Sequence, residues 1–284
     1  MPTVTTRAKV EEAIVLAAGL GSRMQLEFNS SPKPLIPIFD TPLLEYVLKN
    51  LEKIGIKKTV VVTGRKAETI HQWLSEAEFV MEVDDVYNPH YSLGNGISAQ
   101  HGLKYTDTNS VLIVMADHLA SPNLFDRAVQ RKHLRVDLGL VVDYNPYMTP
   151  QLDEPTRVLV NDRDKILEIG KDITNWNCVD TGVFLVSREF VSVVDSVVRK
   201  KGDCIMSDAV NYMIASGRDV QAWNSNGAFW LDIDTPSDLE FAERMILSDQ
   251  ELRDMFEISL KREILSTRKA HDLNYSSSNS EGKF

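Results

Sequence analysis

Cysteine and long apolar runs are scarce in this 284-residue sequence. The two cysteines, Cys178 and Cys204, cannot form a disulfide scaffold, nor a structural zinc site by themselves, so a reducing cytoplasmic location is expected. No apolar run approaches the roughly 18 residues of a membrane span, and the N-terminus lacks the apolar core of a signal peptide. The sequence therefore predicts a cytoplasmic protein with no direct membrane insertion.

Positive charge is also in deficit, since 31 Lys and Arg residues stand against 41 Asp and Glu residues, a net charge of −10. An acidic chain disfavours non-specific binding to nucleic acid or anionic lipid, although a local basic pocket can still bind a small phosphate compound. The sequence offers no Ser-His-Asp or Cys-His constellation for covalent catalysis. Nucleic acid is therefore not expected as a partner.

The first half of the chain alternates short apolar runs with helical patterns. Strands are predicted at 13–18, 59–63, 79–84 and 111–115, and helices at 43–54, 66–75 and 96–104. Strands that alternate with helices at this rhythm are typical of right-handed βαβ units and a mostly parallel sheet.

From about residue 137 the pattern changes to strand-like segments joined by hairpin-style turns. Strands are predicted at 138–143, 157–161, 165–170, 178–187, 219–224 and 228–234, and helices at 188–200, 206–216 and 236–247. Thr235 and Pro236 are typical of an N-cap and a first helical position. The expected fold is a single α/β domain over 12–247, a Rossmann-like, mostly parallel open sheet with an inserted antiparallel layer.

The C-terminal part is predicted to lie outside that domain. Apolar residues recur at helical spacing within 248–270, which predicts an amphipathic helix that docks on the body or on a partner, with a homodimer as one possibility. The Ser-rich segment 271–284 is predicted to be a disordered tail.

The loop after the first strand is a candidate phosphate-binding loop. Gly19 and Gly21 let backbone N–H groups approach a phosphate, and the small Ala17 and Ala18 leave room for a flat base. The Rossmann fingerprint would need Gly or Ala at Met24, and the Walker pattern is absent. The nucleotide-binding residues predicted here are Leu16, Ala17, Ala18, Gly19, Gly21 and Ser22.

Two cations follow this loop. Arg23 lies two residues after Gly21, and Lys33 stands between Pro32 and Pro34, which stiffen the backbone on both sides of it. A lysine in a stiff segment is held in place more firmly than one in a free loop. Arg23 and Lys33 are therefore the candidate catalytic cations.

Carboxylates at two distant strand ends predict a magnesium site. Asp117 follows the strand 111–115, and Asp232 lies where the strand 228–234 gives way to a helix. Mg²⁺ prefers oxygen ligands and is usually held by one or two carboxylates together with substrate phosphates. Period-two alternation would point Asp234 away from Asp232, so Asp234 is the weaker candidate. His118 has no Cys or His at ligand spacing and is expected to support the site rather than bind metal.

The ordered string Leu-x-Ala-Gly-x-Gly-Ser-Arg, followed nine residues later by Pro-Lys-Pro-Leu, resembles the signature of the sugar-phosphate nucleotidylyltransferases, a superfamily that includes MobA-like enzymes. The segments 92–98, 165–172 and 178–184 are similar to that superfamily's base-reading loop and acceptor-binding half. The strings look most like those of cytidylyltransferases that act on inositol 1-phosphate. The resemblance implies nucleotide binding by Gly94, Asn95, Gly96 and Ala116, and acceptor binding by Lys171, Asp180 and Thr181.

The implied reaction is Mg²⁺-dependent transfer of CMP from CTP to a phosphomonoester, with release of pyrophosphate. Arg23 would hold the triphosphate and Lys33 would neutralise charge at the α-phosphate. Phosphocholine, aminoethylphosphonate and sugar 1-phosphates are alternative acceptors, and the choice of CTP over UTP rests on the resemblance. Trp176, Tyr144 and Tyr147 keep a choline-binding aromatic cage possible.

Two other functions remain open from the sequence. A nucleotide-sugar glycosyltransferase would favour an Asp-x-Asp motif in mid-chain, for which Asp84-Asp85 and Asp162-Arg163-Asp164 are rough candidates. A non-catalytic nucleotide sensor would be expected to lack the lysine or an aspartate, and this sequence retains both.

Overall fold

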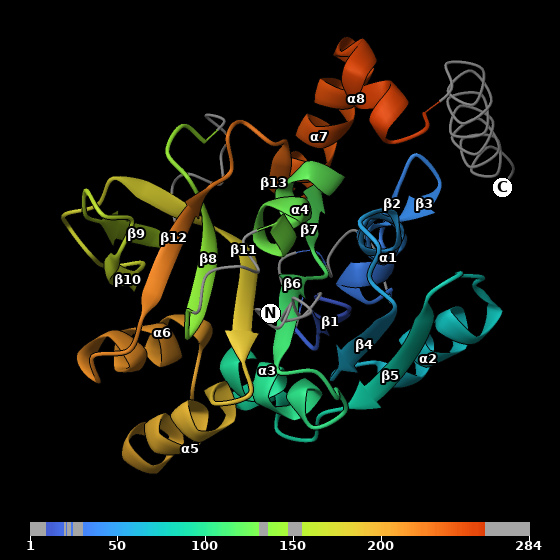
Figure 1. The fold of residues 1–284 in the computed structure, drawn as a ribbon. Coiled ribbons are helices and arrows are strands. Elements are labelled where there is room, and N and C mark those ends of the chain that lie inside the picture. Colours follow the sequence, from blue (N-terminus) through green and yellow to red (C-terminus); the bar gives the residue numbers. More distant parts are fainter. Residues whose placement is uncertain are drawn as a thin grey trace, which may run out of the picture.

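The structure, a computed structural model, describes residues 10–19, 21, 24, 31–130, 136–146 and 155–258. Its centre is a nine-stranded mixed sheet with helices on both faces (Figure 1). The predicted fold class is confirmed.

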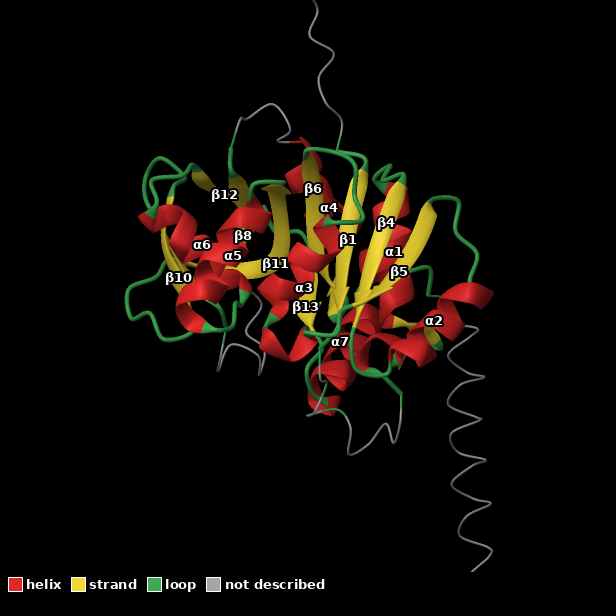
Figure 2. Cartoon of the chain, turned by 90° about the horizontal axis from the view of Figure 1, so that it is seen from below, coloured by secondary structure: helices red, strands yellow, loops and turns green. Residues whose placement is uncertain are grey.

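One half of the sheet is parallel. It consists of β1 (Glu12–Ala17), β4 (Lys58–Thr63), β5 (Glu82–Tyr87) and β6 (Ser110–Met115), which lie side by side in the order β6-β1-β4-β5 (Figure 2). β1 is buried along its whole length because helices cover both of its faces, which is why it reads as a continuous apolar run. The chain runs outward from β1 to β4 and β5 and then returns to pair β6 with β1 on its other side. The gap between β1 and β6 is thus a topological switch point, where open α/β sheets bind ligands.

The other half is mainly antiparallel. It consists of β8 (Leu138–Asp143), β9 (Arg157–Val160), β10 (Ile166–Gly170), β11 (Cys178–Ser187) and β12 (Val220–Asn224). The long strand β11 joins the two halves, since it pairs antiparallel with β6, β8 and β9. Gly139 of β8 packs against the buried Trp223 of β12, where a Cβ would lie only 1.9 Å from the indole ring.

The helices form two layers. α1 (Leu43–Lys53), α2 (Ala67–Glu76) and α4 (Pro122–Gln130) cover one face, and α3 (Asn95–Leu103), α5 (Phe190–Lys201) and α6 (Met206–Ala215) cover the other. Alternate residues of β1 supply the two cores: Ile14 and Leu16 face α3, whereas Ala13 and Val15 belong to the core that contains α1.

Two short ribbons and the C-terminal helices lie beside the sheet. The ribbons are β2 (Pro37–Ile38) with β3 (Thr41–Pro42), and β7 (His118–Ala120) with β13 (Trp230–Asp232). Two 3₁₀ turns, η1 (Lys33–Leu35) and η2 (Tyr91–Leu93), precede α1 and α3. α7 (Pro236–Ser248) begins at Thr235, whose hydroxyl accepts from the backbone N–H of Asp238 as expected for the predicted N-cap. None of the helices in the described ranges is long and apolar enough to traverse a bilayer.

Several predicted elements need correction. The third strand lies at Glu82–Tyr87 rather than 79–84, and the strand predicted at 228–234 is limited to Trp230–Asp232. α4 and β7 have no counterpart in the prediction. β7 is only three residues long, which is too short a pattern to detect.

The predicted helix at 248–270 appears in its described part as α8 (Gln250–Met255). Leu252 and Phe256 are buried, and the Phe256 ring packs edge-on against Tyr46 and Phe229 at centroid distances of 5.5 and 5.6 Å. This part of the apolar face therefore docks on the body of the protein. Residues 259–284, including the predicted tail, lie outside the described ranges.

Candidate functional site

A pocket of about 290 Å³ opens at the switch point between the carboxyl ends of β1 and β6. Its lining comes from the first loop, η1, η2, α3, the end of β6 and the segment before α7: Leu16, Ala17, Ala18, Gly19, Gly21, Lys33, Pro34, Tyr91, Asn95, Ser98, Met115, Ala116, Asp117 and Asp234. Most of the residues predicted from separate stretches of the sequence thus meet at one place.

The first loop needs glycine at Gly21. Its φ is +57°, which L side chains rarely adopt, and a Cβ there would lie 3.0 Å from the Cβ of Lys33. The loop backbone can therefore pass close to the lysine only without a side chain. Ser22 and Arg23, predicted respectively to bind nucleotide and to act as a catalytic cation, lie outside the described residues.

Lys33 lies at the charged end of the pocket. The extended backbone of Pro32 leads into η1, which starts at Lys33 and has Pro34 as its second residue. The lysine side chain is only 8% exposed. Its Nζ lies 2.6 Å from Asp117 Oδ2, 2.5 Å from Asp234 Oδ1 and 3.7 Å from Asp232 Oδ1. The cation and the acids predicted from distant segments therefore meet.

The β7–β13 ribbon positions the acids. Its antiparallel register places Asp232 opposite His118, next to Asp117 in the chain. The backbone N–H of Ile233 also donates to the carbonyl of Asp117 at 3.0 Å. Asp117 and Asp232 are thus held together by backbone hydrogen bonds that do not depend on their own side chains.

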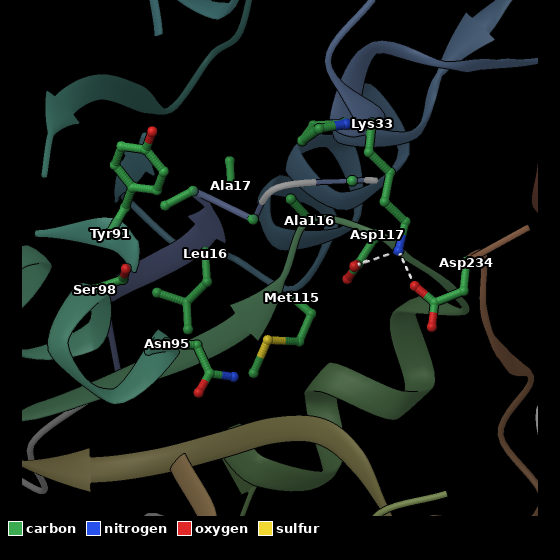
Figure 3. Close-up of a pocket in the computed structure, with 14 residues that line it drawn as sticks. Leu16, Ala17, Lys33, Tyr91, Asn95, Ser98, Met115, Ala116, Asp117 and Asp234 are labelled. Atoms are coloured by element: carbon green, nitrogen blue, oxygen red, sulfur yellow. Dashed lines mark hydrogen bonds and ion pairs between the residues drawn. The ribbon is translucent and has the colours of Figure 1, made fainter. Parts of the chain in front are cut away.

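Asp234 contradicts the orientation predicted for it. Strand alternation does not apply there because β13 ends at Asp232, and the chain turns into the N-cap of α7. The backbone N–H of Asp234 donates to Asp238 Oδ2 at 3.1 Å, and its carboxylate reaches Lys33 (Figure 3). Asp234 therefore faces the same lysine as Asp117 and Asp232, instead of pointing away from Asp232.

Burial and the charges of neighbouring groups shift the pKa values of Lys33, Asp117 and Asp232 away from their ordinary values, and the two acids shift in opposite directions. Burial alone would lower the pKa of Lys33, but the three surrounding carboxylates raise it above its ordinary value. Burial would raise the pKa of Asp117, but the charges of Lys33 and His118 lower it. Burial and repulsion from Asp117 raise the pKa of Asp232. Three carboxylates thus lie around Lys33, and two of them also lie beside His118, so a divalent cation bound to the acids would neutralise part of their negative charge.

The opposite end of the pocket is neutral. Tyr91, Asn95 and Ser98 border it on the side away from Lys33, with Leu16 and Ala17 between the two ends (Figure 3). Asn95 Oδ1 accepts from the backbone N–H at the start of α6, and Ser98 Oγ accepts from an asparagine amide. The pocket thus offers a neutral end to a flat heterocycle and a charged end to phosphates.

Gly94 and Gly96 do not line this pocket. They pack on the backbone of Cys204, where added Cβ atoms would lie 2.3 and 2.9 Å from its carbonyl oxygen. The N–H of Gly96 donates to that same oxygen at 3.0 Å. These two glycines therefore shape the loop that presents Asn95 to the pocket.

The predicted acceptor-binding residues are placed differently from one another. Asp180 is half-buried and accepts from the backbone N–H of Gly182 at 2.7 Å. Thr181 is fully buried, and its hydroxyl donates to the carbonyl of Val141 at 2.8 Å. Thr181 therefore has its side chain in the core rather than on a binding surface. Lys171 lies exposed in the turn after β10.

Asp180 makes the stability of the protein pH-dependent. Burial raises the pKa of its carboxyl to about 6 from an ordinary value of 3.8. The folded state therefore holds a proton that the unfolded state has lost between these pH values, and stability falls as the pH rises through this window. Asp180→Asn removes this loss and keeps an oxygen for the N–H of Gly182. We expect the variant's advantage in unfolding free energy over wild type to grow by up to about 3 kcal/mol between pH 4 and 7.

Urea denaturation of both proteins across this pH range measures the difference. Asp172→Asn, at an exposed position in the turn after β10, reports the effect of removing a surface carboxylate. An Asp180→Asn advantage that stays constant with pH would show that the carboxyl titrates normally.

Sequence reasoning missed several lining residues. Ser98 belongs to the recognised segment 92–98, Met115 ends the predicted strand 111–115, and Tyr91 directly precedes the segment 92–98, so their position in or beside these segments was the available signal. Arg65 and Lys66, at the start of α2, line a small cleft that also contains Gly19, Gly21 and Lys33. They follow β4, whose carboxyl end lies on the same edge of the sheet as that of β1, and only this topology brings them near the first loop.

Comparisons with known proteins agree with this geometry. Residues 13–149 match the family model of the MobA-like NTP transferase domain. A bifunctional IPC transferase and DIPP synthase of Thermococcus kodakarensis is 31% identical over 238 residues, which cover 84% of this chain and 51% of that protein. The protein of the same name from Rubrobacter xylanophilus is 32% identical, over 86% of this chain and 53% of its own length.

A solved structure, the inositol-1-phosphate CTP transferase from T. maritima, superposes with a TM-score of 0.76 at 24% identity, covering 87% of this chain and 98% of that one. At this identity the likeness concerns the fold. The chain spans about half the length of the curated relatives that it matches.

Proposed function

Because residues 13–149 match the family model of the MobA-like NTP transferase domain, we propose that the chain is a Mg²⁺-dependent nucleotidyltransferase that transfers CMP from CTP to a phosphomonoester and releases pyrophosphate. The observation that carries this proposal is the pocket with one neutral end and one charged end at the switch point of the sheet. A nucleoside triphosphate has the same division between its base and its phosphates.

The nucleotide would lie with its base near Tyr91, Asn95 and Ser98 and its phosphates near Lys33. The small Ala17 and Ala18 leave the space that a planar ring needs between these ends, and the backbone N–H groups of Gly19 and Gly21, which also line the pocket, would bind the phosphates. The choice of CTP is supported by the resemblance of the loop at 92–98 to the base-reading loop of the cytidylyltransferases.

The residues present fit a magnesium ion. Hard cations take carboxylate oxygens, and Asp117 and Asp232 offer oxygens within 4.8 Å of each other beside the phosphate end of the pocket. When bound, Mg²⁺ would neutralise charge between the reacting phosphates. Asp117 and Asp232 would hold it, and Asp234 would hold Lys33.

The proposed reaction needs electrostatic stabilisation of its phosphate charges rather than a general base. A phosphomonoester has a second pKa of about 6, so it is largely dianionic at pH 7 and needs no proton removed before it attacks the α-phosphorus. The barrier comes from bringing two polyanions together, and a buried, permanently charged Lys33 lowers it. Arg23 would hold the triphosphate.

Asp180 and Lys171 would bind the acceptor, with inositol 1-phosphate as the first candidate. Asp180 is adjacent to Thr181, whose carbonyl contacts His118, so an acceptor hydroxyl at Asp180 would lie beside the acidic cluster. A choline acceptor is less well supported. The guanidinium of Arg157 already lies 5.7 Å from the centre of the Trp176 ring. Tyr144 is partly buried and packs against the apolar core that contains Cys178.

Neither rough Asp-x-Asp candidate supports a glycosyltransferase. Asp84 and Asp85 on β5 pair with Lys58 and His71, and neither lines the pocket. The turn at 162–164 joins β9 to β10 in the antiparallel half of the sheet. A non-catalytic sensor remains the alternative that only an assay excludes.

The test is a pyrophosphate-release screen of CTP, UTP, ATP and GTP against a dozen phosphomonoesters, each with and without Mg²⁺. We expect release above background with CTP and inositol 1-phosphate only in the presence of metal. Release with another pair would keep the reaction class and change the substrates. Nucleotide binding with no release for any pair would favour the sensor, and no nucleotide binding would refute the proposal.

A further inference from the structure

We infer that His118 is a direct ligand of the divalent metal at this site, together with Asp117 and Asp232. This set of one imidazole and two carboxylates would make the site prefer Mn²⁺ or a similar first-row ion relative to an all-carboxylate site. The inference rests on the proposed metal site and goes beyond it in ligand identity and in metal preference. One nitrogen of His118 and one oxygen of each acid lie within 4.8 Å of one another.

The tautomer of His118 suits a metal ligand. Its Nδ1 lies 2.9 Å from the carbonyl oxygen of Thr181, and a carbonyl only accepts, so Nδ1 carries the hydrogen. In the neutral ring the lone pair then belongs to Nε2. Metal-binding histidines almost always donate their other ring N–H in this way, because the hydrogen bond fixes the ring and raises the basicity of the ligating nitrogen.

The other ring nitrogen, Nε2, lies near both acids. His118 Nε2 lies 3.9 Å from Asp117 Oδ1 and 3.9 Å from Asp232 Oδ1. Metal–ligand bonds of about 2.1 Å place neighbouring ligand atoms about 3 Å apart, so a bound ion would draw Nε2 and each of these two oxygens together by about 1 Å.

The ring has little freedom to turn away. Register in the β7–β13 ribbon holds His118 opposite Asp232. Gly182 packs directly on the ring, where a Cβ would lie 2.5 Å from its Cε1. Trp230 lies on it at a centroid distance of 5.9 Å. The imidazole is therefore held in position by the backbone, as a metal ligand requires.

Lys33 does not fill the position proposed for the metal. Asp117 faces Lys33 with Oδ2 and His118 with Oδ1. Asp232 Oδ1 lies between them, 3.7 Å from the ammonium and 3.9 Å from the imidazole. The acid pair can thus serve a fixed cation on one side and a metal on the other.

Imidazole nitrogen is a softer ligand than carboxylate oxygen and suits first-row transition ions better than Mg²⁺. The alternative is that His118 is an imidazolium ion paired with both acids, in which case no metal–nitrogen bond forms. The two states differ in the coordination of a bound paramagnetic ion, which can be measured without substrate or turnover.

Pulsed EPR of Mn²⁺ bound to the nucleotide-free protein makes this test. We expect a directly bound nitrogen signal that changes when the wild-type protein is labelled with ¹⁵N-histidine, a comparison that needs no variant. The signal should disappear in His118→Asn and persist in His71→Asn, whose exposed histidine pairs with Asp85. Bound Mn²⁺ without nitrogen coupling, or no Mn²⁺ binding at all, would overturn the inference.

Competition between Mn²⁺ and Mg²⁺ tests the preference separately. His118→Asn should weaken Mn²⁺ binding at least about tenfold and Mg²⁺ binding much less. Equal losses for the two ions would overturn the inference. If the protein shows nitrogen coupling but releases no pyrophosphate, His118 is a metal ligand and the proposed reaction is refuted. If it releases pyrophosphate but shows no nitrogen coupling, the proposed reaction holds and His118 is not a metal ligand.

Discussion

Lys33→Met is expected to lower kcat/KM for pyrophosphate release by about 10²–10⁴. The reason is that Lys33 provides a permanently charged, 8% exposed ammonium at the phosphate end of the pocket, held by Asp117 and Asp234 at 2.6 and 2.5 Å. A methionine fills similar volume without charge. The measurement is steady-state turnover with the nucleotide and acceptor that the screen identifies.

The same substitution leaves three carboxylates without their counter-ion, so some loss of stability is expected as well. Lys33→Arg separates the two effects. It restores the positive charge, but the planar guanidinium of arginine does not fit a position shaped for a compact ammonium. Relative to Lys33→Met, the stability of Lys33→Arg should therefore recover more than its activity. Lys49→Met, which breaks an exposed pair with Glu45 on α1, is the matched control. Turnover of Lys33→Met within a few-fold of wild type would refute its assignment.

Asp117→Asn is expected to reduce turnover by a similar factor, about 10²–10⁴, and also to weaken metal binding. Asp117 faces Lys33 with one carboxylate oxygen and His118 with the other, so an isosteric amide disturbs both contacts while preserving shape. Turnover measured across a range of Mg²⁺ concentrations, with Mn²⁺ affinity measured separately, distinguishes lost metal binding from a damaged fold.

Asp195→Asn, an exposed position on α5, is the control for Asp117→Asn. Asp234→Asn is informative beside it, because Asp234 contacts Lys33 and does not belong to the group with His118. We expect Asp234→Asn to impair turnover with less effect on Mn²⁺ affinity. Equal Mn²⁺ affinities for wild type and Asp117→Asn would contradict the metal assignment.

Local patterns in the sequence were enough to predict most of the fold. Continuous apolar runs mark β1 and β6 because both faces of a central parallel strand are covered, and the change of pattern near residue 137 marks the antiparallel half. The loop at 16–21 and Lys33 were also recognised, since each carries its signal within a few neighbouring residues. The roles assigned to Arg23, Lys33 and the acids stay predictions.

The tertiary structure decided which of the predicted residues face the pocket. Thr181 turns into the core, and Gly94 and Gly96 pack on Cys204, because strand pairing and helix packing set side-chain direction. No local pattern contains that information, since the partner segments lie far away in the chain.

Sequence alone therefore determined the fold class and singled out the loop after β1, the lysine and the acids that the structure places at one pocket. Only the tertiary structure decided that Asp234 shares Lys33 and that His118 faces Asp117 and Asp232. The physical reason is that β7 is a three-residue strand, too short to leave a periodic signal. Its backbone hydrogen bonds with β13, far away in the chain, fix the register which sets His118 opposite Asp232.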